Sequence, residues 1–192
     1  INTSINKHYI NKKYHRNFDN DFQIANFLDP KKNTFIFFSS RKVYKSKGNI
    51  KENDKLNPLS NYSKNKLITE NLLKSKLKSN LLILRISNII GFKLKFRKNL
   101  HQTFVDLFYK KAKRGFIYDN ANRFKDFLSV KKFGQILLMM IKKDLRGTYN
   151  VSIGKKVYLN QIINWLNKYN KKPLKIIKSK FIRNQDFYLN NK

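Results

Sequence analysis

The chain has 192 residues, with 43 Lys and Arg against 11 Asp and Glu, a formal net charge of +32 and no cysteine. A hydrophobic content of 41% indicates a folded protein, long enough for one domain or for parts of two. The lack of cysteine excludes disulfides and thiolate metal sites, and the three histidines are scattered, so we predict no metal. No apolar run approaches the ~20 residues that span a bilayer, so we expect no membrane partner and a cytoplasmic location.

The positive charge raises the question of nucleic acid, because basic side chains neutralise phosphates. The lysines are spread along the chain, however, and Asn, Ile, Phe and Tyr are abundant whereas only 6 Gly and 3 Pro occur. The abundant residues share A/T-rich codons, so genome composition alone can produce this charge. We therefore do not expect a nucleic-acid partner. The alternative function that we keep is a non-catalytic, basic protein that binds nucleic acid and has the same fold as the enzyme considered below.

The first half of the chain reads as alternating helices and strands. In chain order we expect a helix at 20–28, a buried strand at 34–38, a helix from Tyr62 to about 78, and a second buried strand at 81–86. A polar loop at 45–59 precedes the second helix, which Ser60 or Asn61 can cap. The order strand, helix, strand predicts a parallel α/β unit, whose ligands lie beyond the carboxyl ends of the strands.

The second half carries weaker patterns. We expect a helix at about 103–113, a short strand at 127–130, a buried helix at 133–142, a strand at 148–152 and an amphipathic helix at 159–169. In the last of these helices we expect Trp165 to pack in the core. After Pro173 the sequence is basic and weakly patterned, and predicts no element.

Three side chains suggest redox chemistry. Tyr62 and Lys66 are four residues apart, so a helix places them on one face, where the ammonium favours the phenolate form of the tyrosine. The hydroxyl of Ser40, at the end of the first strand, can hydrogen-bond the same substrate oxygen. Together these groups suit the interconversion of a carbonyl and an alcohol, with hydride passing to or from a nicotinamide ring.

With these residues in place, the chain resembles the extended short-chain dehydrogenase/reductases, the NAD-dependent epimerase/dehydratase family that acts on nucleotide sugars. The similar segments follow the family's order: Asn20 of its asparagine-bearing helix, Ser40 with Val43 and Tyr44 of its strand-end serine motif, the Tyr62 and Lys66 pair, 84–91 after its sixth strand, 125–130 of its Arg-Asp-Phe strand, and 147–151 of its late strand. The departures are Lys45 for a usual glycine, Lys125 for a usual arginine, and Lys131 and Lys132 for usual aspartates.

The resemblance implies a role for each candidate residue. Those implied as catalytic are Ser40, Tyr62 and Lys66; those implied as binding NAD or NADP are Tyr62, Lys66, Ser39, Ser87 and Asn20; and those implied as binding the substrate diphosphate are Asn88, Arg123 and Lys125. The implied partner is a nucleotide sugar, and a homodimer is left open. No acidic pair lies near the tyrosine, which favours a reductase or epimerase over a dehydratase, with a likeness to the dTDP-4-dehydrorhamnose reductases of the family.

The implied fold is α/β: a partial, doubly wound, Rossmann-like parallel sheet that lacks its first strands, with a small C-terminal α+β substrate-binding region. We assign 1–92 to the C-terminal half of the nucleotide-binding domain and 93–192 to the substrate-binding region, with about 126–152 returning to the main sheet. The 6 glycines form no glycine-rich phosphate-binding turn. We therefore expect these 192 residues to be an inactive fragment of a longer enzyme.

Overall fold

A computed structural model of the chain describes residues 11–91, 108, 115–119, 122–169, 173–178 and 186–190. These residues belong to two compact units. The first comprises Ile1–Lys45, Lys51–Ser87 and Gly134–Val151, and the second Ser46–Ile50, Asn88–Phe133 and Ser152–Lys192. The helix predicted at about 103–113 lies outside the described residues, apart from Phe108.

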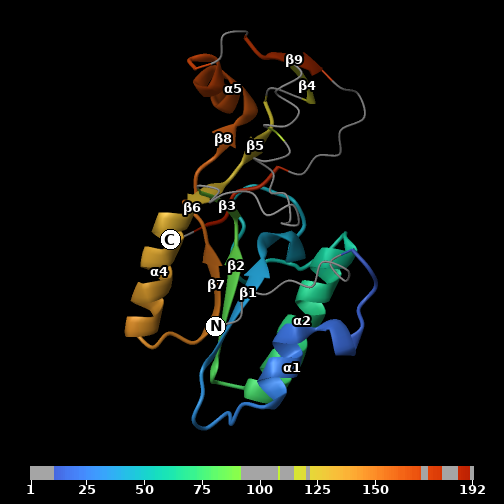
Figure 1. Cartoon of the computed structure of the whole chain (residues 1–192), viewed down its shortest axis with the longest axis vertical. Coiled ribbons are helices and arrows are strands. Elements are labelled where there is room, and N and C mark those ends of the chain that lie inside the picture. The colour runs from blue at the N-terminus through green and yellow to red at the C-terminus, as the bar shows by residue number, and fades with distance from the viewer. Residues whose placement is uncertain are drawn as a thin grey trace. The chain divides into compact units, whose positions relative to one another are not determined.

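The first unit is built on a three-stranded parallel sheet (Figure 1). Its strands are β1 (Phe35–Ser40), β2 (Leu81–Ile86) and β7 (Gly147–Val151), in the order β1-β2-β7. The register pairs Ser40 with Ile86 and Ile86 with Val151, so the three strands end together. The predicted α/β class and parallel strand order are confirmed, and the chemistry-bearing serines lie at the carboxyl edge of this sheet.

Two helices of the first unit are fixed by polar caps. In α1 (Asn20–Asn26), the Asp19 side chain accepts a hydrogen bond from the Phe22 amide at 3.1 Å. In α2 (Asn61–Leu77), Ser60 accepts from the Ser63 amide at 3.2 Å, while Ser63 Oγ accepts from the Ser60 amide at 3.0 Å. Each cap satisfies amides that the helix itself cannot pair, and of the two residues predicted to cap α2 it is Ser60 that does so.

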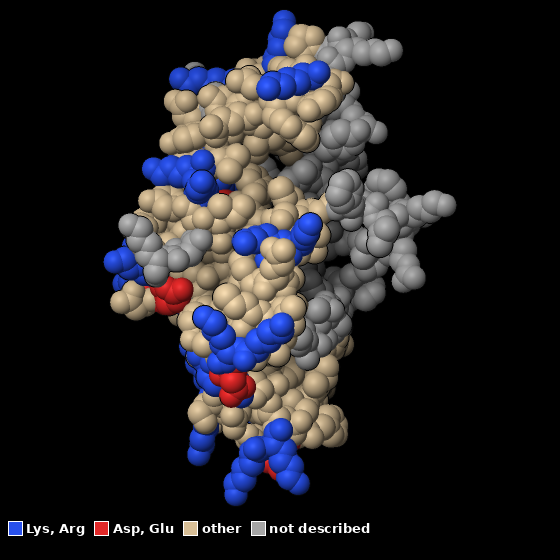
Figure 2. Space-filling view, turned by 90° about the vertical axis from the view of Figure 1, so that its left-hand side faces the viewer, with Lys and Arg blue, Asp and Glu red and all other residues tan. Residues whose placement is uncertain are grey.

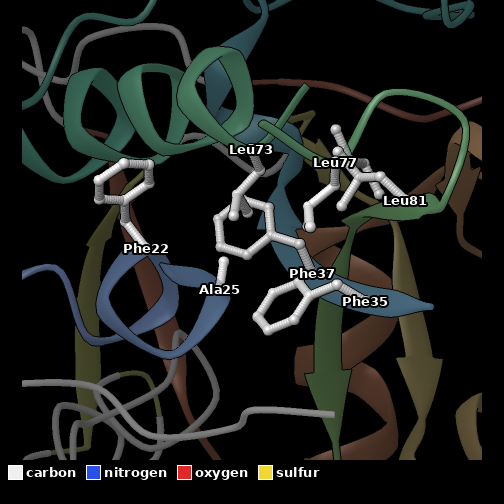
Figure 3. Packing of buried hydrophobic residues seen from close by; sticks show 8 residues of the cluster. Phe22, Ala25, Phe35, Phe37, Leu73, Leu77 and Leu81 are labelled. Atoms are coloured by element: carbon white, nitrogen blue, oxygen red, sulfur yellow. The ribbon is translucent and has the colours of Figure 1, made fainter. Parts of the chain in front are cut away.

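The hydrophobic core of this unit lies where α1 and α2 pack against β1 and β2 (Figure 3). Phe37 and Leu73 are completely buried and their side chains meet near the centre of the cluster. The cluster comprises Phe22, Ala25, Phe35, Phe37, Leu73, Leu77, Leu81 and Ile83. Burying side chains of this size stabilises a fold by about 1.5–3 kcal/mol each, so this cluster anchors α2 to the sheet edge.

The described residues of the second unit form three pairs of short strands. These are β3 (Asn88–Ile90) with β6 (Phe127–Ser129), β4 (Phe116–Asp119) with β9 (Lys175–Lys178), and β5 (Phe124–Lys125) with β8 (Val157–Tyr158). The helix α5 (Leu159–Asn167) packs on β4 and β9 through Leu159, Ile163 and neighbouring apolar residues. The strand β9 falls where the sequence predicted no element.

Helix α4 (Val130–Lys142) begins three residues before the predicted start, and the prediction that it is buried is wrong. Of its described residues only Met140 is buried, whereas Leu138, Met139 and Ile141 are 44–54% exposed. Helix α5 ends two residues before its predicted end. Trp165 is 58% exposed, so its predicted place in the core is wrong. The inward positions of α5 are taken by Leu159, Ile163 and Leu166, and Trp165 stacks edge-on against Tyr169 instead. None of the described helices is long and apolar enough to cross a bilayer.

Candidate functional site

The carboxyl end of β1 carries the two serines that the sequence singled out. Ser39 is buried, and its hydroxyl donates to Glu70 Oε1 at 2.5 Å. Ser40 is also buried, and its Oγ accepts a hydrogen bond from the Lys42 amide at 3.3 Å, which caps the short 3-10 helix η2 (Arg41–Val43). Because Oγ serves as acceptor in that bond, the Ser40 hydroxyl proton can still be donated to a ligand.

Tyr62 lies in the first turn of α2, where the Ser60 and Ser63 cap fixes the backbone. Helix α2 packs against η2, so the tyrosine helix and the strand-end serine segment adjoin. Lys42 of η2 makes one such contact, because its ammonium lies over the Tyr62 ring, 5.5 Å from the ring centroid. The structure thus brings Tyr62 to the segment that begins at Ser40.

Lys66 lies one turn along the same helix, but its ammonium has other neighbours. Lys66 Nζ is 3.6 Å from Asp21 Oδ2 and 4.5 Å from the centroid of the Phe37 ring. Within the described part of the chain, no hydrogen bond or ion pair joins Lys66 to Tyr62. The common helix face predicted for the two side chains is present, while the direct action of Lys66 on the phenol stays a prediction.

A buried ion pair that the sequence reading missed lies beneath the serines. Arg85 in β2 and Glu70 in α2 are 2% and 0% exposed. Arg85 Nη2 is 2.6 Å from Glu70 Oε2 and Arg85 Nε is 3.1 Å from Oε1, so the contact is bidentate. Glu70 Oε1 also accepts from Ser39, which ties the strand-end serine to helix α2.

The same network reaches Tyr44, just after η2. The Tyr44 hydroxyl accepts a hydrogen bond from Arg85 Nη1 at 2.7 Å and donates one to Asn150 Oδ1 at 3.0 Å. The backbone N–H of Asn150 in turn donates to Glu52 Oε1 at 2.8 Å. Burial raises the pKa of Tyr44, an effect that the Arg85 guanidinium partly offsets. Burial alone would lower the pKa of Arg85, but the hydrogen bonds with Glu70 and Tyr44 raise it above its ordinary value. The Glu70–Arg85 pair therefore holds the residues on either side of Ser40: Glu70 binds Ser39, and Arg85 binds Tyr44.

Two other predicted residues belong to the first unit. Ser87 follows β2 at the carboxyl edge, and its Oγ is the only buried side-chain polar atom of the described residues without a hydrogen-bond partner. An unpaired buried hydroxyl is costly, which indicates a group that a ligand can satisfy. Asn20 is the half-buried first residue of α1 and therefore occupies an ordinary helix start.

The three predicted substrate contacts lie in the second unit. Asn88 Nδ2 donates to the Asp126 carbonyl oxygen at 3.1 Å, and Arg123 Nε is 3.3 Å from Asp186 Oδ1. Lys125 is buried, with its ammonium 5.7 Å from the centroid of the Phe187 ring. None of these contacts tests whether the three side chains bind a diphosphate, so that role stays a prediction.

Asp126, between Lys125 and Phe127, holds several segments of the second unit together. Its carboxylate is fully buried and accepts from the amides of Ile153, Gly154 and Leu189 at 3.1–3.3 Å. Burial raises the pKa of Asp126, and these hydrogen bonds oppose that rise. The available sequence signal was a single acidic residue directly before the apolar residues Phe127 and Leu128.

No metal site appears in what the structure describes, since no three His, Asp or Glu side chains there cluster as ligands. On the face shown in Figure 2, the blue Lys and Arg side chains stand in scattered groups with few acidic neighbours. The geometry at the carboxyl edge of the sheet, with hydroxyls, a phenol and ammonium groups, suits proton transfer and oxygen-rich ligands.

The comparison with known proteins agrees with this geometry. The profile of the "NAD dependent epimerase/dehydratase family" matches residues 5–152, and the chain belongs to that family. No curated protein matches the chain in sequence.

Solved structures with the same fold cover most of the chain. A UDP-N-acetylglucosamine 4-epimerase from Methanobrevibacter ruminantium is 25% identical, with a TM-score of 0.63 over 81% of this chain and 52% of its own. WbmG from Bordetella bronchiseptica, solved with NAD, is 17% identical, with a TM-score of 0.69 over 93% of this chain and 61% of its own. A dTDP-4-dehydrorhamnose reductase from Clostridium acetobutylicum is 18% identical, with a TM-score of 0.63 over 81% and 56%. The chain therefore spans about half to three fifths of the length of these proteins.

Proposed function

We propose that the chain is part of an NAD(P)-dependent enzyme that oxidises and reduces a carbon of a nucleotide-linked sugar. The observation that carries the proposal is the approach of the Ser40 segment to Tyr62, through Lys42 and the packing of η2 on α2. In this proposal the Ser40 hydroxyl donates a hydrogen bond to the reacting sugar oxygen. Tyr62 Oη removes the proton from that oxygen in oxidation and returns it in reduction.

The proposed cofactor is NAD or NADP, and the described residues fit it at the sheet edge. When bound, its nicotinamide ring accepts or delivers the hydride. Ser87 Oγ, buried and unpaired among the described residues, can satisfy its hydrogen bond with the cofactor. Lys66 has one carboxylate neighbour, Asp21, for three ammonium protons, which leaves donors for ribose hydroxyls. The Ser39 hydroxyl donates its hydrogen bond to Glu70, and Asn20 is the first residue of α1. We therefore propose that these two residues hold the site in place more than they bind the cofactor directly.

For the substrate, we propose that Asn88, Arg123 and Lys125 contact the diphosphate, as the family resemblance implies. Between Ser40 and Tyr44 the chain carries the cations Arg41 and Lys42 and no carboxylate. A dehydration step needs an acid and a base beside the sugar carbon that loses its hydroxyl. The composition of this segment therefore favours reduction or epimerisation over dehydration.

We further propose that the glycine-rich phosphate-binding turn is contributed by additional chain. The support is the coverage of 52–61% of the solved relatives and the absence of a glycine cluster among the 6 glycines. We call the product of the whole gene the full gene product. NAD(H) should bind the full gene product, and not the 192 residues alone. Tight binding of NAD(H) to the 192 residues would refute this part.

The function is tested by following nicotinamide absorbance in the full gene product with UDP- and dTDP-sugars. Tyr62→Phe and Ser40→Ala should each lower turnover about 100-fold or more, because each removes a proton-transfer or orienting group. Tyr169→Phe is the matched control, because Tyr169 is 75% exposed on the second unit. Equal turnover in Tyr62→Phe and Tyr169→Phe would refute the assigned chemistry.

A further inference from the structure

Lys42 is a cation of the Ser40 and Tyr62 site to which neither the sequence reading nor the family resemblance gave a role. Its backbone is fixed by the Ser40 hydroxyl, which accepts from the Lys42 amide at 3.3 Å. Its ammonium reaches over the Tyr62 ring, 5.5 Å from the centroid. Lys42 thus contacts the Ser40 hydroxyl through its backbone and the face of the Tyr62 ring through its ammonium.

The charge on Lys42 is not matched by an acidic side chain. Lys66 has Asp21 and Arg85 has Glu70, but no carboxylate of the described residues pairs with Lys42. The Lys42 residue as a whole is exposed to solvent. Partial burial of its ammonium and the adjacent Arg41 lower the pKa of Lys42, so its charged form is disfavoured where it stands. An anion placed beside it would relieve both effects.

We propose that Lys42 is a specificity residue that selects a nucleotide sugar bearing a carboxylate on the carbon next to the reacting centre. The inference rests on the proposed function, since Ser40 and Tyr62 define where the reacting carbon lies. A carboxylate beside that carbon meets the Lys42 ammonium in a charge-assisted hydrogen bond, which is stronger than a bond to a neutral hydroxyl. A neutral sugar presents only a hydroxyl there, which can accept a hydrogen bond but leaves the Lys42 cation without a counter-charge.

The experiment compares two probes that differ at one carbon, UDP-glucuronic acid and UDP-glucose, with UDP as the sugar-free reference. Binding to the full gene product, with cofactor present, is measured by calorimetry. We expect UDP-glucuronic acid to bind about ten- to a hundredfold more tightly than UDP-glucose, the range of one charge-assisted hydrogen bond. Lys42→Met should remove this preference and Lys42→Arg should keep most of it. Lys45→Met is the control, because it removes the same charge from an exposed position three residues along.

A second readout locates the contact directly. Acylation of lysines by an amine reagent, mapped by mass spectrometry, should be slowed at Lys42 by UDP-glucuronic acid more than by UDP-glucose, and should be unchanged at Lys45. Equal affinity for both sugars, or a preference that survives in Lys42→Met, would overturn the inference and leave the proposed function intact. A Lys42→Met loss equal for both sugars and for UDP would mean that Lys42 binds diphosphate, and would also overturn it. If neither UDP-sugar binds, this inference is overturned, and the proposed function fails with it only if dTDP-sugars are not turned over either.

Discussion

The buried Glu70–Arg85 pair gives the sharpest prediction about stability. Replacing Glu70 by Gln keeps an acceptor for Ser39 but leaves the Arg85 guanidinium buried without a counter-charge. Arg85 is 2% exposed and Glu70 is completely buried, so water cannot supply the missing interaction. Removing one partner of such a pair costs about 3–5 kcal/mol, whereas an exposed pair contributes about 0–1 kcal/mol.

Amide hydrogen exchange is the suitable assay, because the chain forms two units and a single global unfolding free energy is not defined for it. Peptides that cover β1 and β2 report the free energy of opening around the pair. A loss of about 3–5 kcal/mol corresponds to exchange that is faster by roughly 100-fold to several thousandfold. The double replacement Glu70→Met with Arg85→Met should cost less than the sum of the single replacements, because no buried charge remains.

The chain contains a matched control in Arg146 and Asp144. Their side chains are also close, at 2.7 Å, but 27% and 79% exposed. Asp144→Asn should change exchange in β1 and β2 by less than about fivefold. If Glu70→Gln changed exchange no more than Asp144→Asn does, the argument from burial would be refuted.

Three further changes test the fold around the site. Leu73→Ala, at a completely buried core position, should cost about 2–5 kcal/mol in denaturant unfolding of the first unit, whereas Ile68→Ala, at 36% exposure, should cost less than about 1 kcal/mol. Ser60→Ala should destabilise the first turn of α2 by about 1 kcal/mol, seen as faster exchange at Tyr62 and Ser63, and Ser60→Asp should restore it. The pKa of Asp126 is raised in the folded protein, so the folded protein holds this proton more tightly than the unfolded chain does. The contribution of Asp126 to the free energy of unfolding is therefore largest at acid pH, and it falls as the pH rises from the pKa of the unfolded chain through that of the folded protein. Asp126→Asn should flatten that slope at pH values above about 4, the ordinary pKa of an aspartate, and an unchanged slope would contradict the assignment.

The parallel sheet of the first unit could be predicted because its signals are local. The runs at 35–38 and 81–84 are continuous and apolar, as buried parallel strands are, and a capped helix of crossover length separates them. That order places Ser39, Ser40 and Ser87 at one edge by topology alone. The short strand β9 could not be predicted in the same way, because Lys175–Lys178 has only two apolar residues and depends on pairing with β4.

The polar network of the site was harder to predict, because its partners are far apart in the chain. Glu70 and Arg85 come from a helix and a strand, and Tyr44 meets Asn150 across 106 positions. The available signal was a charge inside an apolar run, at Arg85, and an acid one turn after Lys66, at Glu70. Lys42 was overlooked because one lysine in so basic a chain carries little information. Trp165 was misplaced because an aromatic residue in an amphipathic helix usually faces the core.

The central claim is that Ser40, Tyr62 and Lys66 serve a hydride transfer between a nucleotide-linked sugar and a nicotinamide ring. It is tested most directly with a nucleotide sugar carrying deuterium at the reacting carbon, incubated with the full gene product and NAD⁺ or NADP⁺. The account predicts deuterium on the nicotinamide ring in the native protein and in Tyr169→Phe, and a rate lower by about 100-fold or more in Tyr62→Phe. Sugar and cofactor that both bind without any passage of deuterium between them would contradict it.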